Sequence, residues 1–153
     1  MSNLSDNTLV INHQDGPICL QLANGGYAIY ADRITISVSA ETEEDVHPQY
    51  GAICLEGFPL THLPQAGDVF KHSGGMFVDD FTATTKSHGY FEFHVEEITV
   101  IWTVVSVSAN SIRFSLEALH DDTDSYDENA MQTPTLGIFD LSPTPLSELW
   151  VPV

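Results

Sequence analysis

The sequence predicts an all-β, mostly antiparallel fold, a sandwich or a closed barrel of about nine or ten short strands with little helix. Apolar and polar residues alternate along many short segments, and Gly, Asn, Asp and Pro separate these segments. No stretch carries the apolar period of a three-turn amphipathic helix. The 153 residues suit one domain spanning 1–153, because domains cluster near roughly 100–150 residues. Between the two architectures, the sandwich is favoured and the barrel stays open, because strand order is not readable from the sequence.

The first 40 residues are expected to form short strands joined by tight turns. Asp15-Gly16-Pro17 separates the apolar run Thr8–His13 from Ile18–Leu22. Asn24-Gly25-Gly26 is expected to be a hairpin turn, because Asn and Gly tolerate the positive φ of a tight turn. The segment Arg33–Ala40 alternates apolar and polar residues and predicts a half-buried strand.

The middle of the chain is less regular. Short strands are expected at Tyr50–Glu56 and near Met76–Asp80. The segment Thr61–Gly75, which is rich in Pro, His and Gly, is expected to be a loop. In Tyr90–Glu96, apolar residues alternate with charged or polar ones, which predicts a strand with one solvent face.

A hairpin is predicted in the second half. Ile98–Val107 is apolar on both faces and is expected to be a central strand covered on both sides. Ser108–Ser111 forms the turn, and Ile112–Leu119 returns with alternating polarity. After an acidic loop, Leu136–Leu141 is expected to be a strand, and Leu146–Val151 returns to the sheet or holds a short helical turn.

Four individual residues carry expectations of their own. Cys19 and Cys54 lie in apolar strand-like segments, and we expect two buried, reduced thiols. Trp102 lies in the predicted central strand and is expected in the core. Trp150 is expected to seal the core, with a role as an exposed anchor for a partner as the alternative.

Net charge is the unusual property of this chain. It has 22 Asp and Glu but only 4 Lys and Arg, which gives a net charge of −18. Nucleic acids and anionic membranes are therefore excluded as expected partners, because binding phosphates needs clustered cations. No apolar run approaches the roughly 20 residues of a membrane helix, and the first residues show no secretory signal. We expect a soluble, cytoplasmic protein, and no sequence pattern indicates its oligomeric state.

Two acidic runs follow predicted strands. Nine of their residues are the predicted partner-binding residues: Glu41, Glu43, Glu44, Asp45, Asp121, Asp122, Asp124, Asp127 and Glu128. If the two strands run in the same direction, both runs lie at one end of the fold and their fields add. Solubility, or adaptation to a salty environment, is the alternative explanation for the charge.

Motifs of enzyme chemistry are scarce. The sequence contains no G-x-S-x-G, P-loop, G-x-G-x-x-G, H-E-x-x-H or C-x-x-C. The best metal-like spacing places Glu92, His94 and Glu96 on one strand face, where His62 or His72 would complete a cupin-like site. A solvent face of an antiparallel strand is the favoured interpretation, so no catalytic residue, metal or cofactor is predicted and a non-enzyme is favoured.

These observations favour a small acidic interaction protein that docks onto a basic protein partner. An immunity or inhibitor protein against a cationic toxin or nuclease is its concrete form, because an array of carboxylates imitates the phosphates that a nuclease binds. Two alternatives stay open. One is a β-sandwich module that binds a sugar or a metal, and the other is a cupin-like metal-dependent β-barrel enzyme.

Overall fold

The computed structural model describes residues 6–13, 16–41, 49–73, 76–80, 99–121 and 132–149. The described strands are β1 (Thr8–His13), β2 (Gly16–Tyr30), β3 (Arg33–Glu41), β4 (Gln49–Pro59), β5 (Val69–Ser73), β6 (Met76–Asp80), β7 (Thr99–Val107), β8 (Ile112–Asp121) and β9 (Gln132–Leu141). A single 3₁₀ turn at Leu146–Glu148 is the helical element among these residues. None of the described helical segments is long and apolar enough to cross a membrane.

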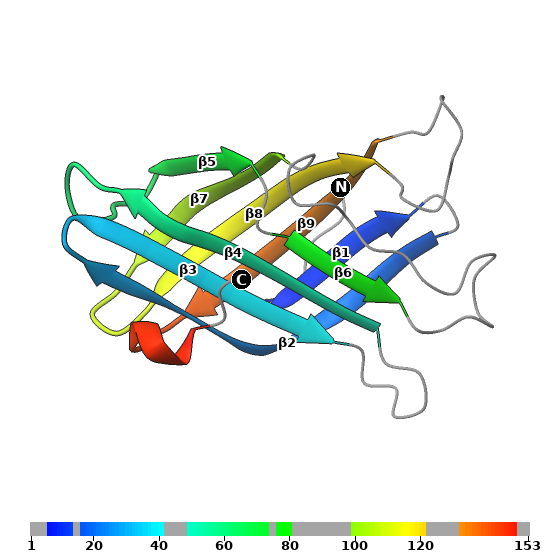
Figure 1. The fold of residues 1–153 in the computed structure, drawn as a ribbon, viewed down its shortest axis with the longest axis horizontal. Helices are drawn as coiled ribbons and strands as arrows, with labels where there is room; N and C mark the ends of the chain where they lie inside the picture. Colours follow the sequence, from blue (N-terminus) through cyan, green and yellow to red (C-terminus); the bar gives the residue numbers. More distant parts are fainter. Residues whose placement is uncertain are drawn as a thin grey trace.

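The described strands form one antiparallel sheet in the order β5-β7-β8-β9-β1-β2-β3-β4-β6. The sheet curls until β4 and β5 face each other, so the fold is a nearly closed barrel (Figure 1). Within the described part of the chain, no backbone hydrogen bonds join β4 to β5 across this seam. Side chains pack across it instead, and the rings of Phe58 and Phe70 lie 5.2 Å apart. The predicted all-β fold is therefore confirmed, and of the two architectures the chain adopts a barrel with one seam.

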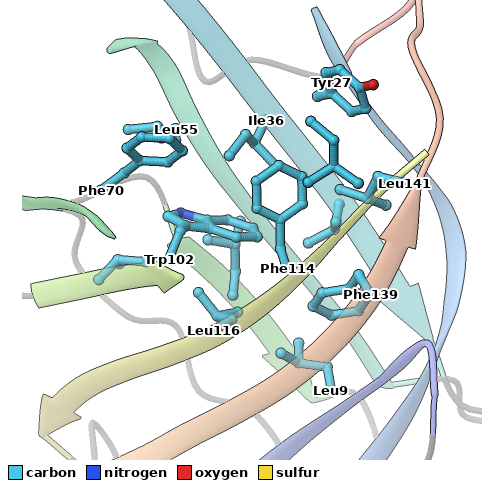
Figure 2. Packing of buried hydrophobic residues seen from close by; sticks show 14 of the residues in the cluster. Leu9, Tyr27, Ile36, Leu55, Phe70, Trp102, Phe114, Leu116, Phe139 and Leu141 are labelled. Carbon is cyan, nitrogen blue, oxygen red and sulfur yellow. The ribbon is translucent and has the colours of Figure 1, made fainter. Parts of the chain in front are cut away.

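Aromatic side chains fill the barrel. Trp102, Phe114 and Phe139 are fully buried. Trp102 meets Phe114 edge to face, with ring centroids 6.0 Å apart, and Tyr27 approaches Phe114 from the other side at 6.1 Å (Figure 2). Such edge-on pairs place the positive ring edge against the negative ring face. The expectation that Trp102 belongs to the core is confirmed, whereas Trp150 lies outside the described residues.

The predicted β7–β8 hairpin is confirmed, but β7 is not covered on both faces. Val100, Trp102 and Val104 point into the core, while Val105 and Val107 are 46% and 47% exposed. The architecture explains this error, because the described strands form a single curled sheet and no second sheet covers its outer face. β5 itself lies in a segment that was expected to be a loop.

The hairpin turn predicted at Asn24-Gly25-Gly26 is wrong. β2 runs through this segment with one register shift between Leu22 and Asn24, and it pairs first with β1 and then with β3. The turn comes later, at Ala31-Asp32, where both residues have positive φ, 49° and 61°. Two successive positive φ values define the type I′ turn that suits a two-residue hairpin.

Gly26 serves a tertiary contact instead of a turn. A Cβ on Gly26 would lie 2.0 Å from Oγ1 of Thr144, so only glycine lets the chain after β9 approach β2 this closely. Tyr27 donates its N–H to the carbonyl of Ser142 and accepts a hydrogen bond from the N–H of Thr144. We call residues 142–149 the C-terminal strap. It ends on Leu149, which is 9% exposed.

The two cysteines differ. Cys54 is buried as predicted, but Cys19 is exposed, and both are free thiols. Leu20 faces the core, and successive side chains of a strand alternate, so its neighbour Cys19 faces outward.

Candidate functional site

The strands that lead into the two acidic runs point the same way. β3 connects to β8 through four antiparallel pairings, with β2, β1, β9 and then β8, so β3 and β8 run in the same direction. Figure 1 shows both arrowheads at the right-hand end of the barrel. The two strands that precede the acidic runs therefore run in the same direction, as the prediction of one acidic end requires. We call the end of the barrel where β3 and β8 terminate the Glu41–Asp121 end.

Register sets how far apart the two strand ends lie. Glu41 pairs with Gln21 of β2, which pairs with Thr8 of β1, and Thr8 pairs with Ile138 of β9. Ile138 pairs with Ser115, so Ser115 is the residue of β8 at the same height in the sheet as Glu41. Asp121 therefore lies about 20 Å farther along β8, and β3 is about 19 Å away across the sheet. On a flattened sheet the two residues are about 28 Å apart, and curling shortens this. One interface of standard size, roughly 800 Å² and so about 30 Å wide, covers both strand ends.

Only part of the predicted binding surface is described. Glu41 is exposed at the end of β3, and Asp121 is the last residue of β8. The other predicted partner-binding residues lie outside the described residues: Glu43, Glu44, Asp45, Asp122, Asp124, Asp127 and Glu128.

The two arginines of the chain lie at the opposite end of the same strands. Arg33 is the first residue of β3 and donates a hydrogen bond of 2.8 Å to the carbonyl oxygen of Gly57. Arg113 is the second residue of β8 and forms ion pairs with Asp6 and, at 2.8 Å, with Asp140. The hydrogen bond with Asp6 raises the pKa of Arg113 further. Both arginines are thus held at the opposite end, whereas Lys71 of β5 pairs with Ile101, which pairs in turn with Glu117 of β8.

The predicted metal site is not assembled by the described residues. Glu92, His94 and Glu96 lie outside them, and no group of three or more His, Cys, Asp or Glu within them is placed to hold a metal. The candidate fourth ligands have other contacts. His72 Nε2 accepts a hydrogen bond of 3.1 Å from the indole N–H of Trp102, and His62 contacts Asp68 at 3.1 Å.

The thiols offer no nucleophile in a cleft. Burial, and secondly the charge of Glu56, raise the pKa of Cys54 to about 12, so this thiol stays protonated at neutral pH. Cys19 is exposed, and it lies in the walls of neither the groove beside β2 nor the groove over the β4–β5 seam.

The sequence predicted neither of these two grooves. The larger, about 630 Å³, lies between Tyr27–Tyr30 of β2 and Pro143–Leu146 of the strap. The smaller, about 250 Å³, lies over the seam between β4 and β5 and contains His62, Asp68 and the rings of Phe58 and Phe70. Both depend on segments far apart in sequence, and no local pattern marks such a juxtaposition.

Comparison with known proteins supplies no relative. No protein-family model, no curated protein and no solved structure matches this chain. The fold and the distribution of charge are therefore the basis for assigning a function.

Proposed function

We propose that this protein is a small acidic interaction protein that docks onto a basic protein partner through its Glu41–Asp121 end. The observation that carries the proposal is the common direction of β3 and β8, whose acidic continuations follow Glu41 and Asp121 in the sequence. Fields of carboxylates at one end of a molecule add, and they steer a cationic partner toward that end.

The placement of the two arginines supports the same orientation. Arg33 and Arg113 are held by hydrogen bonds and ion pairs at the other end of β3 and β8. Net charge is −18, so mutual repulsion of the acidic groups opposes the compact fold, and a basic partner relieves it on binding. An immunity or inhibitor protein that covers the phosphate-binding cleft of a cationic nuclease or toxin is the concrete form of this proposal.

The test compares two triple variants with the same change in charge. One carries Asp121→Asn, Asp122→Asn and Asp124→Asn. The control carries Asp6→Asn, Glu56→Gln and Asp140→Asn, three exposed residues away from the Glu41–Asp121 end, two of them beside Arg113. A basic partner is first captured from the source cell at low salt and identified, and its association rate is then measured by stopped flow.

We expect the first variant to associate about tenfold more slowly at low salt and with a flatter salt dependence, because steering contributes roughly 10–10³ to such rates. The control variant is expected to stay within twofold of wild type. Equal rates for wild type and the first variant at low salt, or equal slowing in the control, would contradict the proposal.

A further inference from the structure

Beside the larger groove, one backbone position of β2 has no hydrogen-bond partner within the described residues. Tyr27 directs its N–H and its carbonyl away from β3, to Ser142 and Thr144 of the strap. The directions of the peptide groups repeat every second residue along a strand, so the N–H and carbonyl of Ile29 also point away from β3. Neither group has a partner among the described residues.

The strap leaves β2 at this point. In a continued parallel ladder, Ile29 would bond to the carbonyl of Thr144 and to the N–H of Leu146, by analogy with Tyr27. Instead, Leu146 begins the 3₁₀ turn, after Pro145, which has no N–H. The edge of β2 therefore extends one pairing position beyond the segment that covers it.

The groove opens where the two segments separate. Its walls are Tyr27–Tyr30 on one side and Pro143–Leu146 on the other, with a volume of about 630 Å³, within the range of ligand sites. Ile29 is 39% and Leu146 is 43% exposed, so each presents apolar surface to an occupant. A free edge beside apolar side chains is the arrangement by which proteins bind an added strand.

The negative charge of the chain indicates which kind of molecule fits the groove beside β2. A second copy of this chain brings another −18, which opposes association. One exposed acidic residue, Asp32, follows the groove wall two residues after Tyr30, and Glu148 of the strap lies beside Asn24 and Ser39. Arg33 directs its guanidinium to the carbonyl of Gly57 on β4. A polypeptide with basic residues flanking its apolar ones is complementary to this surface.

We propose that the groove beside β2 binds an extended, basic polypeptide segment of a partner protein, which adds as a short strand at Ile29. The groove lies near the end of β3 where the strand begins, and Ile29 pairs with Ile34, about 23 Å along β3 from Glu41. The proposal therefore does not rest on the Glu41–Asp121 end, and the two sites can succeed or fail separately.

The test uses labelled heptapeptides and the full chain. The basic peptide is Lys-Val-Thr-Val-Thr-Val-Lys. One comparison peptide replaces both Lys by Glu, and another replaces the central Val by Pro. We expect saturable binding of the basic peptide in fluorescence anisotropy, at least tenfold weaker binding of the other two, and slower hydrogen exchange at the Ile29 amide in the complex. The triple variant at Asp121, Asp122 and Asp124 is expected to bind the peptide within twofold of wild type.

Two variants of Ile29 test the position itself. Ile29→Pro removes the unpaired donor and leaves the β2–β3 ladder intact, because the lost N–H faces the groove. Ile29→Lys keeps the N–H but removes the apolar side chain and adds repulsion, and Val107→Lys makes the same charge change at a comparably exposed strand residue. We expect at least tenfold weaker binding in both Ile29 variants and a change below twofold in the control.

Three results would overturn the proposal. One is no saturation by the basic peptide below about 1 mM. Another is unchanged binding in Ile29→Lys, whose folding is checked by its urea transition. The third is equal binding of the basic peptide and its proline form, since attraction to an acidic surface needs no strand pairing.

Discussion

The contact between Gly26 and the C-terminal strap predicts a large effect from the smallest possible side chain. A Cβ at this position lies 2.0 Å from Oγ1 and 2.6 Å from Cβ of Thr144, well inside van der Waals distance. Thr144 is held to β2 by a hydrogen bond of 2.8 Å from its N–H to the carbonyl of Tyr27. The variant Gly26→Ala must therefore displace the strap rather than rotate one side chain.

The size of the effect follows from what the strap loses. Two backbone hydrogen bonds with Tyr27 contribute about 1 kcal/mol each. Exposure of Leu149, now 9% exposed, removes about 1 kcal/mol or more. Replacing glycine lowers the entropy of the unfolded chain and returns about 0.4–1 kcal/mol. We expect Gly26→Ala to lower the free energy of unfolding by about 2–3 kcal/mol in urea titrations.

A second substitution isolates the clash. Thr144→Gly removes the atoms that a Cβ on Gly26 would strike, so Gly26→Ala should cost less than about 1 kcal/mol in that background. A stability of Gly26→Ala within about 0.5 kcal/mol of wild type would refute the reasoning. So would an equal penalty with and without Thr144→Gly, since the strap contact would then not be the cause.

Other predictions address the thiols and the core. One thiol, Cys19, is expected to react with a chromogenic disulfide at pH 8 in the native state, and two in denaturant. The pKa of Cys54 is about 12 in the folded chain and near 9.0 in the unfolded chain, so between these pH values only the unfolded thiol ionises and the free energy of unfolding should fall by about 1.4 kcal/mol per pH unit. The difference in unfolding free energy between wild type and Cys54→Ala, measured against pH, should show this slope. A difference that does not change with pH contradicts the prediction. Trp102→Ala is expected to destabilise the fold by about 3–5 kcal/mol, and a loss below 1 kcal/mol would show that the indole is not a core element. A Cβ at Gly137 would lie 2.7 Å from the ring of Phe139, so Gly137→Ala should be destabilising alone and nearly neutral with Phe139→Leu, as measured by thermal unfolding.

Local patterns predicted the elements whose causes are local. The positions of β3 and of the β7–β8 hairpin follow from alternation and from a short polar turn, and the structure has both. The prediction that β3 is half-buried is wrong, because Thr35 and Ser37 on its polar face are buried as well. The hairpin turn predicted at Asn24-Gly25-Gly26 is wrong because Gly26 instead contacts Thr144, which is more than 100 residues away in the chain. β5 was missed because its segment, Val69–Ser73, is a short edge strand at the seam of the barrel.

The candidate sites also combine features that local sequence patterns predict with features that depend on distant parts of the chain. The acidic runs were visible as composition, but the common direction of β3 and β8 depends on β9 and β1 lying between them, which no local pattern specifies. The groove beside β2 is formed when the strap returns from the far end of the chain, so residue types at Tyr27–Tyr30 alone give no signal.

The pairing of β1 with β9 constrains how the molecule is made. Thr8 lies opposite Ile138, so one edge of β1 stays open until β9 has left the ribosome. A ladder that joins such distant segments carries a large loop-closure entropy, which places the barrel among the slowly folding topologies. During synthesis the first four strands therefore expose the edge that β9 later covers, and a nascent-chain chaperone that masks strand edges would raise the yield of this protein.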